Sequence, residues 1–196
     1  MYPRGEIKVS FPVAAAFKGE KEYQTNTKNG ESVQEAVKNA QKIVTDHIEE
    51  TDEEKLRSYK KEICGLVSYN EDTAGASYGN PWQLIWVFDK DEKTNVVCEG
   101  YAKAFKYLCD QSSFNGNIRC ITVTGTMSDG KNSERHMWNV VLMDDGCNYL
   151  ADLTNCDGDS DDPSIGYPDK LFLTGSWIEK KKNGYVFQCD TGSVSY

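Results

Sequence analysis

The chain has 196 residues, a net charge of −9 and 38% hydrophobic residues, which is ordinary for one globular domain with a core of its own. A nucleic-acid-binding protein needs a basic face, which an acidic chain does not offer, so we expect no nucleic-acid partner. No apolar run approaches the roughly 20 residues that cross a bilayer, so we also expect no membrane span.

Two helices are predicted in the first third of the chain. The first covers residues 32–48 and starts with a capping box of Ser32 and Glu35. Helical spacing places on its buried face Val33, Val37, Ala40, Val44 and His47. Thr51 and Glu54 form a second capping box, which opens a helix whose apolar positions are Leu56, Tyr59, Ile63 and Leu66. The Gly, Asn and Pro content of residues 69–81 predicts a loop after this helix.

A third helix is predicted within VVCEGYAKAFKYLCD, residues 96–110. Its apolar side chains recur at the spacing of one buried stripe: Cys98, Tyr101, Ala102, Phe105, Leu108 and Cys109. Cys98 stands at the start of this helix, where the helix N-terminus lowers the pKa of a thiol, and a nearby imidazolium lowers it further. Position alone leaves two interpretations of Cys98 open, a nucleophile or a small buried apolar residue. We expect Gly100 to leave room for a substrate backbone.

Strands are predicted over residues 119–125, 136–143 and 147–154, the last two joined as a hairpin by the turn at 144–146. A three-residue loop with Gly146 in the left-handed conformation pairs Met143 with Cys147.

This hairpin register makes His136 and Asp152 diagonal neighbours on one face of the sheet, whereas a two-residue loop would put them on opposite faces. The turn residues favour the first arrangement. A carboxylate beside a histidine orients the imidazole and sets its tautomer. The other histidine, His47, is expected to have a structural or surface role.

Cysteine at a helix start, histidine at a strand start and aspartate on the next strand follow the order of a Cys–His–Asp triad. The stretches VVCEGYAKAFKYLCD, GTMSDGKNSERHMWNVVLM and NYLADLTNCD resemble the three blocks of the transglutaminase-like superfamily: a Cys-x-Gly-Tyr-Ala helix, a His-x-Trp-Asn-x-Val strand and an Asp-x-Thr strand. The helix TDEEKLRSYKKEICGLVSYN also resembles the segment before the catalytic cysteine in bacterial members. The resemblance covers roughly residues 51–175.

The resemblance implies an α+β fold with a papain-like or transglutaminase-like core, in which the nucleophile helix packs on an antiparallel sheet. It implies Cys98 as nucleophile, His136 as general base and acid, and Asp152 as its orienting partner. Residues 51–196 would form the catalytic domain, and residues 1–50 an N-terminal extension with a helix in the same unit. Family members often carry an aromatic and an acidic residue after the Asp-x-Thr, whereas here Asn155 and Cys156 come before Asp157, so the resemblance does not specify the nearby wall of the cleft.

The predicted reaction is acyl transfer to an amine, or hydrolysis, at a glutamine side chain or peptide bond, through a thioester. The backbone N–H of Cys98, with Gln83 or a nearby tyrosine, would hold the oxyanion, and Trp138 and Asn139 would support the cleft. We expect a protein or peptide substrate, including cell-wall or surface-associated ones, and no cofactor or metal. The flanking β-domains of animal transglutaminases have no room in this chain, so their calcium dependence is not expected.

Two alternatives remain open. One is a catalytically silent domain that kept the fold and binds a partner. The other is a structural module of a bacterial surface protein, held by disulfides among seven cysteines, an odd number. Resemblance to bacterial members predicts an extracellular or cell-surface location, with the leader not present in this chain and the cytoplasm as the alternative.

Two further motifs are weaker. GASYG, residues 75–79, matches the nucleophile elbow of serine hydrolases but lacks the strand before it and the helix after it. DGDSDDP, residues 157–163, is similar to a calcium loop but lacks the Gly at position six and the Glu at position twelve. We interpret it as a solvated acidic loop.

Overall fold

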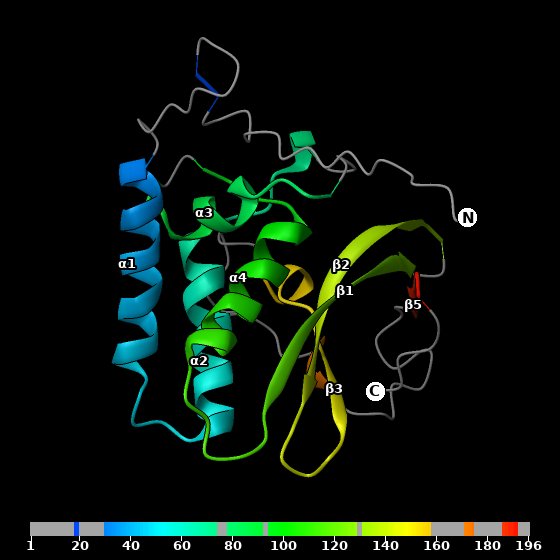
Figure 1. Ribbon diagram of the computed structural model, residues 1–196. Helices are drawn as coiled ribbons and strands as arrows, with labels where there is room; N and C mark the ends of the chain where they lie inside the picture. Colours follow the sequence, from blue (N-terminus) through cyan, green and yellow to red (C-terminus); the bar gives the residue numbers. More distant parts are fainter. Residues whose placement is uncertain are drawn as a thin grey trace, which may run out of the picture.

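A computed structural model describes most of the central part of the chain. The described residues are 18–19, 30–73, 78–91, 94–128, 131–157, 171–174 and 186–191. They form a group of helices packed beside an antiparallel sheet, so the fold class is α+β, as predicted (Figure 1). The GASYG motif, except its last two residues, and the acidic loop after Asp157 lie outside the described residues.

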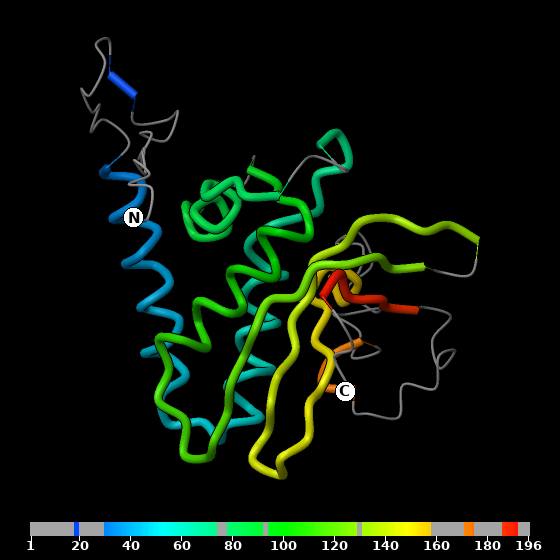
Figure 2. The backbone as a smooth tube through the Cα atoms, turned by 45° about the vertical axis from the view of Figure 1, so that its right-hand side comes forward, coloured from blue at the N-terminus to red at the C-terminus, as the bar shows by residue number. Residues whose placement is uncertain are grey.

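The helices lie on one side of the molecule, and α4 runs between the other helices and the sheet (Figures 1 and 2). Their bounds are α1 Gly30–Asp46, α2 Asp52–Leu66, α3 Trp82–Phe88 and α4 Cys98–Gln111, with the short 3-10 helices η2 Glu71–Thr73 and η3 Thr154–Cys156. The sheet has the strands β1 Arg119–Ser128, β2 Ser133–Leu142, β3 Asn148–Ala151, β4 Phe172–Thr174 and β5 Val186–Cys189, in the order β4-β3-β2-β1-β5.

Helix α1 buries a different face from the predicted one. It begins at Gly30, so Ser32 lies inside the first turn and not at the cap, and Val37 is 37% exposed. The buried side chains are Ala36, Asn39, Ala40 and Ile43. The amide of Asn39 donates to the carbonyl of Phe88 at 2.9 Å. The buried face is thus offset by about one position from the predicted valine stripe.

The capping box of α2 is confirmed. Thr51 is the N-cap, its hydroxyl accepts from the backbone N–H of Glu54, and the Glu54 carboxylate accepts from the N–H of Thr51 at 2.9 Å. Such a cap satisfies two backbone donors that a helix start otherwise leaves without partners, and is worth about 1 kcal/mol.

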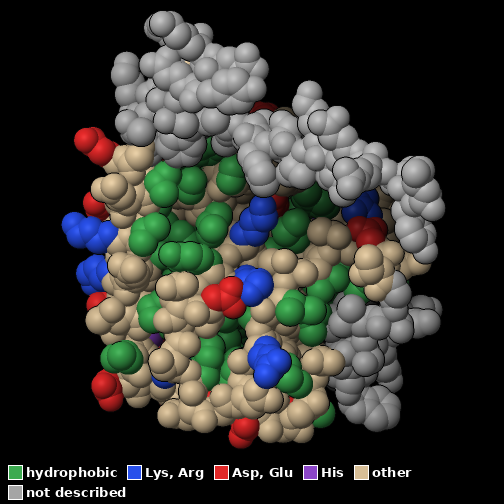
Figure 3. Space-filling view, viewed as in Figure 1, with side chains coloured by type: hydrophobic (Ala, Val, Ile, Leu, Met, Phe, Trp, Pro, Cys, Tyr) green, Lys and Arg blue, Asp and Glu red, His purple; other side chains and the backbone are tan. Residues whose placement is uncertain are grey.

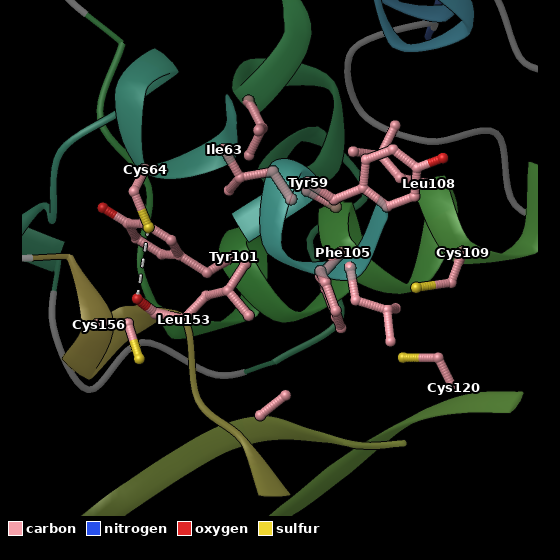
Figure 4. Close-up of a cluster of buried hydrophobic side chains, with 14 of the residues drawn as sticks. Tyr59, Ile63, Cys64, Tyr101, Phe105, Leu108, Cys109, Cys120, Leu153 and Cys156 are labelled. Atoms are coloured by element: carbon pink, nitrogen blue, oxygen red, sulfur yellow. Dashed lines mark hydrogen bonds between the residues drawn. The ribbon is translucent and has the colours of Figure 1, made fainter. Parts of the chain in front are cut away.

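Helix α4 forms the centre of the core. All six residues of its predicted stripe are buried, and Tyr101, Phe105 and Leu108 pack between α2 and the sheet (Figure 4). Burying a large apolar side chain of this kind stabilises the fold by about 1.5–3 kcal/mol. The N-terminus of α4 is therefore held rigidly against β2, where the candidate catalytic residues lie.

The surface of the face seen in Figure 3 mixes groups of hydrophobic side chains with lysine and arginine side chains. None of the described helices is both long and apolar enough to span a membrane.

Candidate active site

Cys98 is the first residue of α4, as the sequence predicted. The N-cap residue, Val97, has an extended backbone, and the Cys98 side chain is only 5% exposed. It packs with Ala102 from the next turn, Met137 from β2 and Tyr78 from the loop before α3. A residue at this position has a backbone N–H with no acceptor inside the helix.

The prediction for Gly100 needs correction. A Cβ at this position would lie 2.5 Å from the Cβ of Val96, and the N–H of Gly100 donates to the Val97 carbonyl at 2.8 Å. Glycine is required here because the chain turns tightly into the helix over Val96, and not because a substrate backbone approaches it.

The hairpin has the predicted register. Met143 N–H donates to the Cys147 carbonyl at 2.9 Å, and Gly146 has φ of +77°. The ladder continues through Asn139 paired with Ala151, where β3 ends. One residue further along, Asp152 lies beside His136: Nε2 of His136 is 2.9 Å from Oδ2 of Asp152, and both side chains are buried. The turn chemistry thus brings together the two residues that the sequence paired.

His136 also reaches Cys98. Its ring hydrogen-bonds the Cys98 thiol, and since Nε2 faces Asp152, Nδ1 is the nitrogen left for the sulfur. Burial on its own lowers the pKa of His136, but the charge and hydrogen bond of Asp152, and then Cys98, outweigh burial and raise that pKa to about 10. At neutral pH the imidazole therefore carries a proton and a positive charge between a sulfur and a carboxylate.

Asp152 has a further partner that the sequence analysis missed. Its Oδ2 also accepts from the side-chain amide of Asn155 at 2.7 Å, while its backbone N–H donates to the Leu171 carbonyl at 2.8 Å. Asn155 lies in η3, one of the two positions noted as a departure from the family pattern. The departure from the family pattern at Asn155 was the one sign in the sequence that could have identified this partner of Asp152. The sequence does not show, however, which way the side-chain amide of an asparagine just beyond a strand end points.

Two aromatic rings support His136. Trp138 stacks on it with ring centroids 6.1 Å apart and an interplanar angle of 13°, and Phe187 of β5 contacts both rings. Trp138 is 1% exposed, so it lies beneath His136 and does not line an open cleft. Phe187 was not identified from the sequence, because its strand is only four residues long.

Gln83 and Tyr78 both contact residues at the start of α4. The Gln83 Oε1 accepts the Val97 N–H at 2.9 Å, which leaves its NH2 group as the donor end. The Tyr78 hydroxyl lies 3.9 Å from the Cys98 sulfur. Burial, and then Cys98, raise the pKa of Tyr78 well above its ordinary value, so its hydroxyl stays protonated and can donate.

A buried carboxylate holds the loop that carries Tyr78. Glu99, next to the cysteine, accepts the Gly79 N–H at 2.8 Å and pairs with Lys103 at 2.5 Å. From the other side, the Arg135 guanidinium lies 5.8 Å from the centre of the Tyr78 ring. The loop is thus fixed to both α4 and β2. Sequence reasoning gave Glu99 no role, since a glutamate in a first turn is ordinary.

The remaining predicted residues lie outside this cluster. Asn139 is fully buried and donates to the Ala102 carbonyl at 2.9 Å, so it joins β2 to α4. His47 lies after α1 and pairs with Glu50 at 3.0 Å and Glu62 at 3.3 Å, a structural role. Within the described ranges, no three His, Cys, Asp or Glu side chains are arranged to hold a metal ion.

Comparisons with known proteins add little to this picture. No protein-family model and no curated protein matches the chain. A match among the solved structures is described as a crystal structure of a TGase, with 14% identity and a TM-score of 0.45, covering 78% of this chain and 39% of that one. This weak likeness is compatible with a transglutaminase-like fold. A structural likeness this weak does not indicate a function, so the proposed function rests on the geometry of the site.

Replacing Asn155 by alanine is expected to weaken the site without dismantling it. The variant loses a hydrogen bond to a charged acceptor, which is worth about 1.5–3 kcal/mol, and leaves Asp152 free to turn away from His136. We expect the free energy of unfolding to fall by about that amount and alkylation of Cys98 at pH 6 to slow about tenfold. Urea unfolding and peptide mass spectrometry measure the two effects. Asn117→Ala, at an exposed position, is the matched control, and equal behaviour of the two variants would show that Asn155 does not support Asp152.

Proposed function

We propose that the protein is a thiol-dependent acyltransferase or hydrolase that acts on glutamine side chains or peptide bonds through a thioester on Cys98. The observation that carries this proposal is the continuous set of contacts from the Cys98 thiol through the His136 ring to the Asp152 carboxylate, 2.9 Å from Nε2. A nucleophile, a base in contact with it and a group that orients the base are the parts that nucleophilic catalysis requires.

The reaction begins with the Cys98 thiolate attacking the carbonyl carbon of the amide. His136, protonated at neutral pH, donates its proton to the nitrogen of the leaving ammonia or amine as the carbon–nitrogen bond breaks. A thioester and a neutral His136 remain. His136 then takes a proton from the attacking water or primary amine, the carbon–sulfur bond breaks to release the acid or the new amide, and the Cys98 thiolate and protonated His136 are restored.

The tetrahedral intermediate carries a negative oxygen that needs donors. The Cys98 backbone N–H is one, because a helix start leaves it without an acceptor inside the helix. Gln83 is the stronger candidate for the second oxyanion donor, because its oxygen accepts the Val97 N–H and its NH2 group is left to donate. The other candidate for this second donor is the Tyr78 hydroxyl, which lies close to the sulfur.

A specific observation favours the second candidate function, a silent domain that binds a partner. Cys98 is only 5% exposed, and Tyr78 packs on it. The sulfur is therefore largely covered, as expected of a domain that binds no substrate at this position.

A screen for the reaction tests the proposal. The protein is incubated with glutamine-containing peptides, with and without a primary amine, and ammonia release and peptide mass are followed. Hydroxylamine, a strong nucleophile toward thioesters, is added in a parallel set to trap the acyl group as a hydroxamate. We expect ammonia and hydroxamate together, or peptide cleavage with hydroxamate. Absence of all of these across a diverse peptide set, with alkylation showing an unreactive Cys98, would favour the silent domain.

A further inference from the structure

Two cysteines outside the candidate active site lie against each other. Cys109 is in the last turn of α4 and Cys120 is the second residue of β1, and their side chains point toward one another (Figure 4). The two thiols are in hydrogen-bond contact. Sulfur atoms in such contact need a further approach to about 2.05 Å to form a covalent bond.

The same two residues line a surface pocket of about 360 Å³ at the far end of α4 from Cys98. Phe114 and Ile118 form apolar parts of its wall, and Arg119 and Asp110 bring charge of both signs. Cys109 and Cys120 are 6% and 5% exposed, so the pocket is the route by which a small reagent reaches them. Burial in the wall of this pocket distinguishes the pair from Cys64 and Cys156, which are buried but do not line it.

We propose that Cys109 and Cys120 form a dithiol modification site, which a small-molecule disulfide of the glutathione type oxidises to a disulfide bond between α4 and β1. One protein thiolate attacks a sulfur of the glutathione disulfide, forms a mixed disulfide and releases one glutathione thiolate. The second protein thiolate attacks the protein sulfur of that mixed disulfide and releases the other glutathione. The two protein thiols are oxidised, the glutathione disulfide is reduced to two thiols, and the two protons pass to the released thiolates.

The pair Cys64 and Cys156 serves as an internal comparison. Both residues are buried, but the Cys64 thiol donates to the Leu153 carbonyl at 3.8 Å, which lies between the two side chains in Figure 4. Neither residue lines the pocket formed by Cys109 and Cys120. We therefore expect this second pair to stay reduced under conditions that oxidise the first.

Burial and the contact with Cys120 raise the pKa of the Cys109 thiol well above its ordinary value. Little thiolate is then present at neutral pH, so we expect oxidation of the pair to be slower than reaction of the exposed Cys147, and to accelerate as pH rises.

The experiment uses the whole protein, purified in reductant, exchanged into oxidised glutathione and quenched with iodoacetamide without further reduction. Trypsin cuts after Lys106, Arg119 and Lys131, so Cys109 and Cys120 fall in separate peptides, 107–119 and 120–131. We expect these two peptides to appear linked, at the sum of their masses less two hydrogen atoms.

Glutathione on Cys147 shows that the oxidant was effective. Two separate, alkylated peptides with glutathionylated Cys147 would overturn the proposal, as would linkage of Cys109 to any other cysteine. A Cys109→Ser variant is expected to carry glutathione on Cys120 as a stable mixed disulfide, because the resolving thiol is absent. An unmodified Cys120 in that variant would also count against the proposed route through the pocket.

Discussion

Cys98→Ala is expected to abolish turnover of any amide substrate, with a loss on the order of 10⁴-fold or more. Removing the nucleophile of a triad leaves only the contribution of substrate binding and oxyanion donors. Alanine fits the site, because Cys98 is a buried side chain packed with Ala102 and Met137, and the deletion leaves a space of one sulfur atom. We therefore expect the fold to remain, and circular dichroism with urea unfolding checks this directly.

The matched control is Cys147→Ala, which removes an exposed cysteine in the hairpin turn. Its turnover should equal that of the parent protein. If Cys98→Ala kept a tenth or more of the parent activity while Cys147→Ala lost activity, the nucleophile would be wrongly assigned. Loss of activity in both variants with intact folds would point to a general dependence on thiols and not to one nucleophile.

Gly125→Ala is expected to have the largest effect on stability. Gly125 of β1 pairs with His136 on one side and with Cys189 of β5 on the other. A Cβ there would overlap the carbonyl oxygen of Gln188 and lie 2.7 Å from the Cη2 atom of Trp138. Backbone cannot move aside as a flexible side chain can, so either β5 separates or Trp138 shifts. Overpacking of this kind costs about 1–3 kcal/mol or more, and we expect the upper end.

The consequence reaches the candidate active site, because Trp138 stacks on His136 and Phe187 of β5 contacts both rings. Urea unfolding followed by tryptophan fluorescence should show a lower midpoint in Gly125→Ala, and Cys98 should lose its reactivity at pH 6. Gly30→Ala is the control: a Cβ there meets nothing within 4 Å, so stability should be unchanged or slightly higher. Equal stability of the two variants would show that β5 does not pack on Gly125 as described.

The parts of the fold that follow strong local patterns could be predicted from the sequence. The stripe of α4 was one, because six apolar residues at helical spacing leave a single face to bury. The hairpin was another, since the Asp-Asp-Gly turn sets the register and the register alone decides whether His136 and Asp152 share a face. The pairing of these two residues therefore needed no information from distant parts of the chain.

Other features depend on contacts that no local pattern encodes. Helix α3 is seven residues long and almost wholly apolar, so it shows no helical period. The buried face of α1 is offset from the expected stripe, and its buried Asn39 bonds the Phe88 carbonyl, a contact between distant elements that helical spacing does not encode. The pKa of His136, about 10, results from burial opposed by Asp152 and Cys98, and this balance exists only once three separate elements have assembled.

Under the proposed function, the protonated His136 beside Cys98 makes this thiol reactive, and the rate of Cys98 alkylation against pH tests this most directly. Iodoacetamide labelling is read on the tryptic peptide 94–103, in which Cys98 is the single cysteine. Because the pKa of His136 is about 10, the imidazolium persists up to that pH, so the parent protein should be labelled rapidly at pH 6 and nearly as fast at pH 8.

His136→Ala removes this positive charge and should slow labelling at pH 6 sharply. Its rate should then rise about tenfold per pH unit, as for an ordinary thiol with a pKa of about 8.5. His47→Ala, which removes the other histidine of the chain, is the matched control and should behave like the parent. Labelling of Cys98 that is slow at pH 6 in the parent and indifferent to the loss of His136 would contradict the assignment of a thiolate–imidazolium pair.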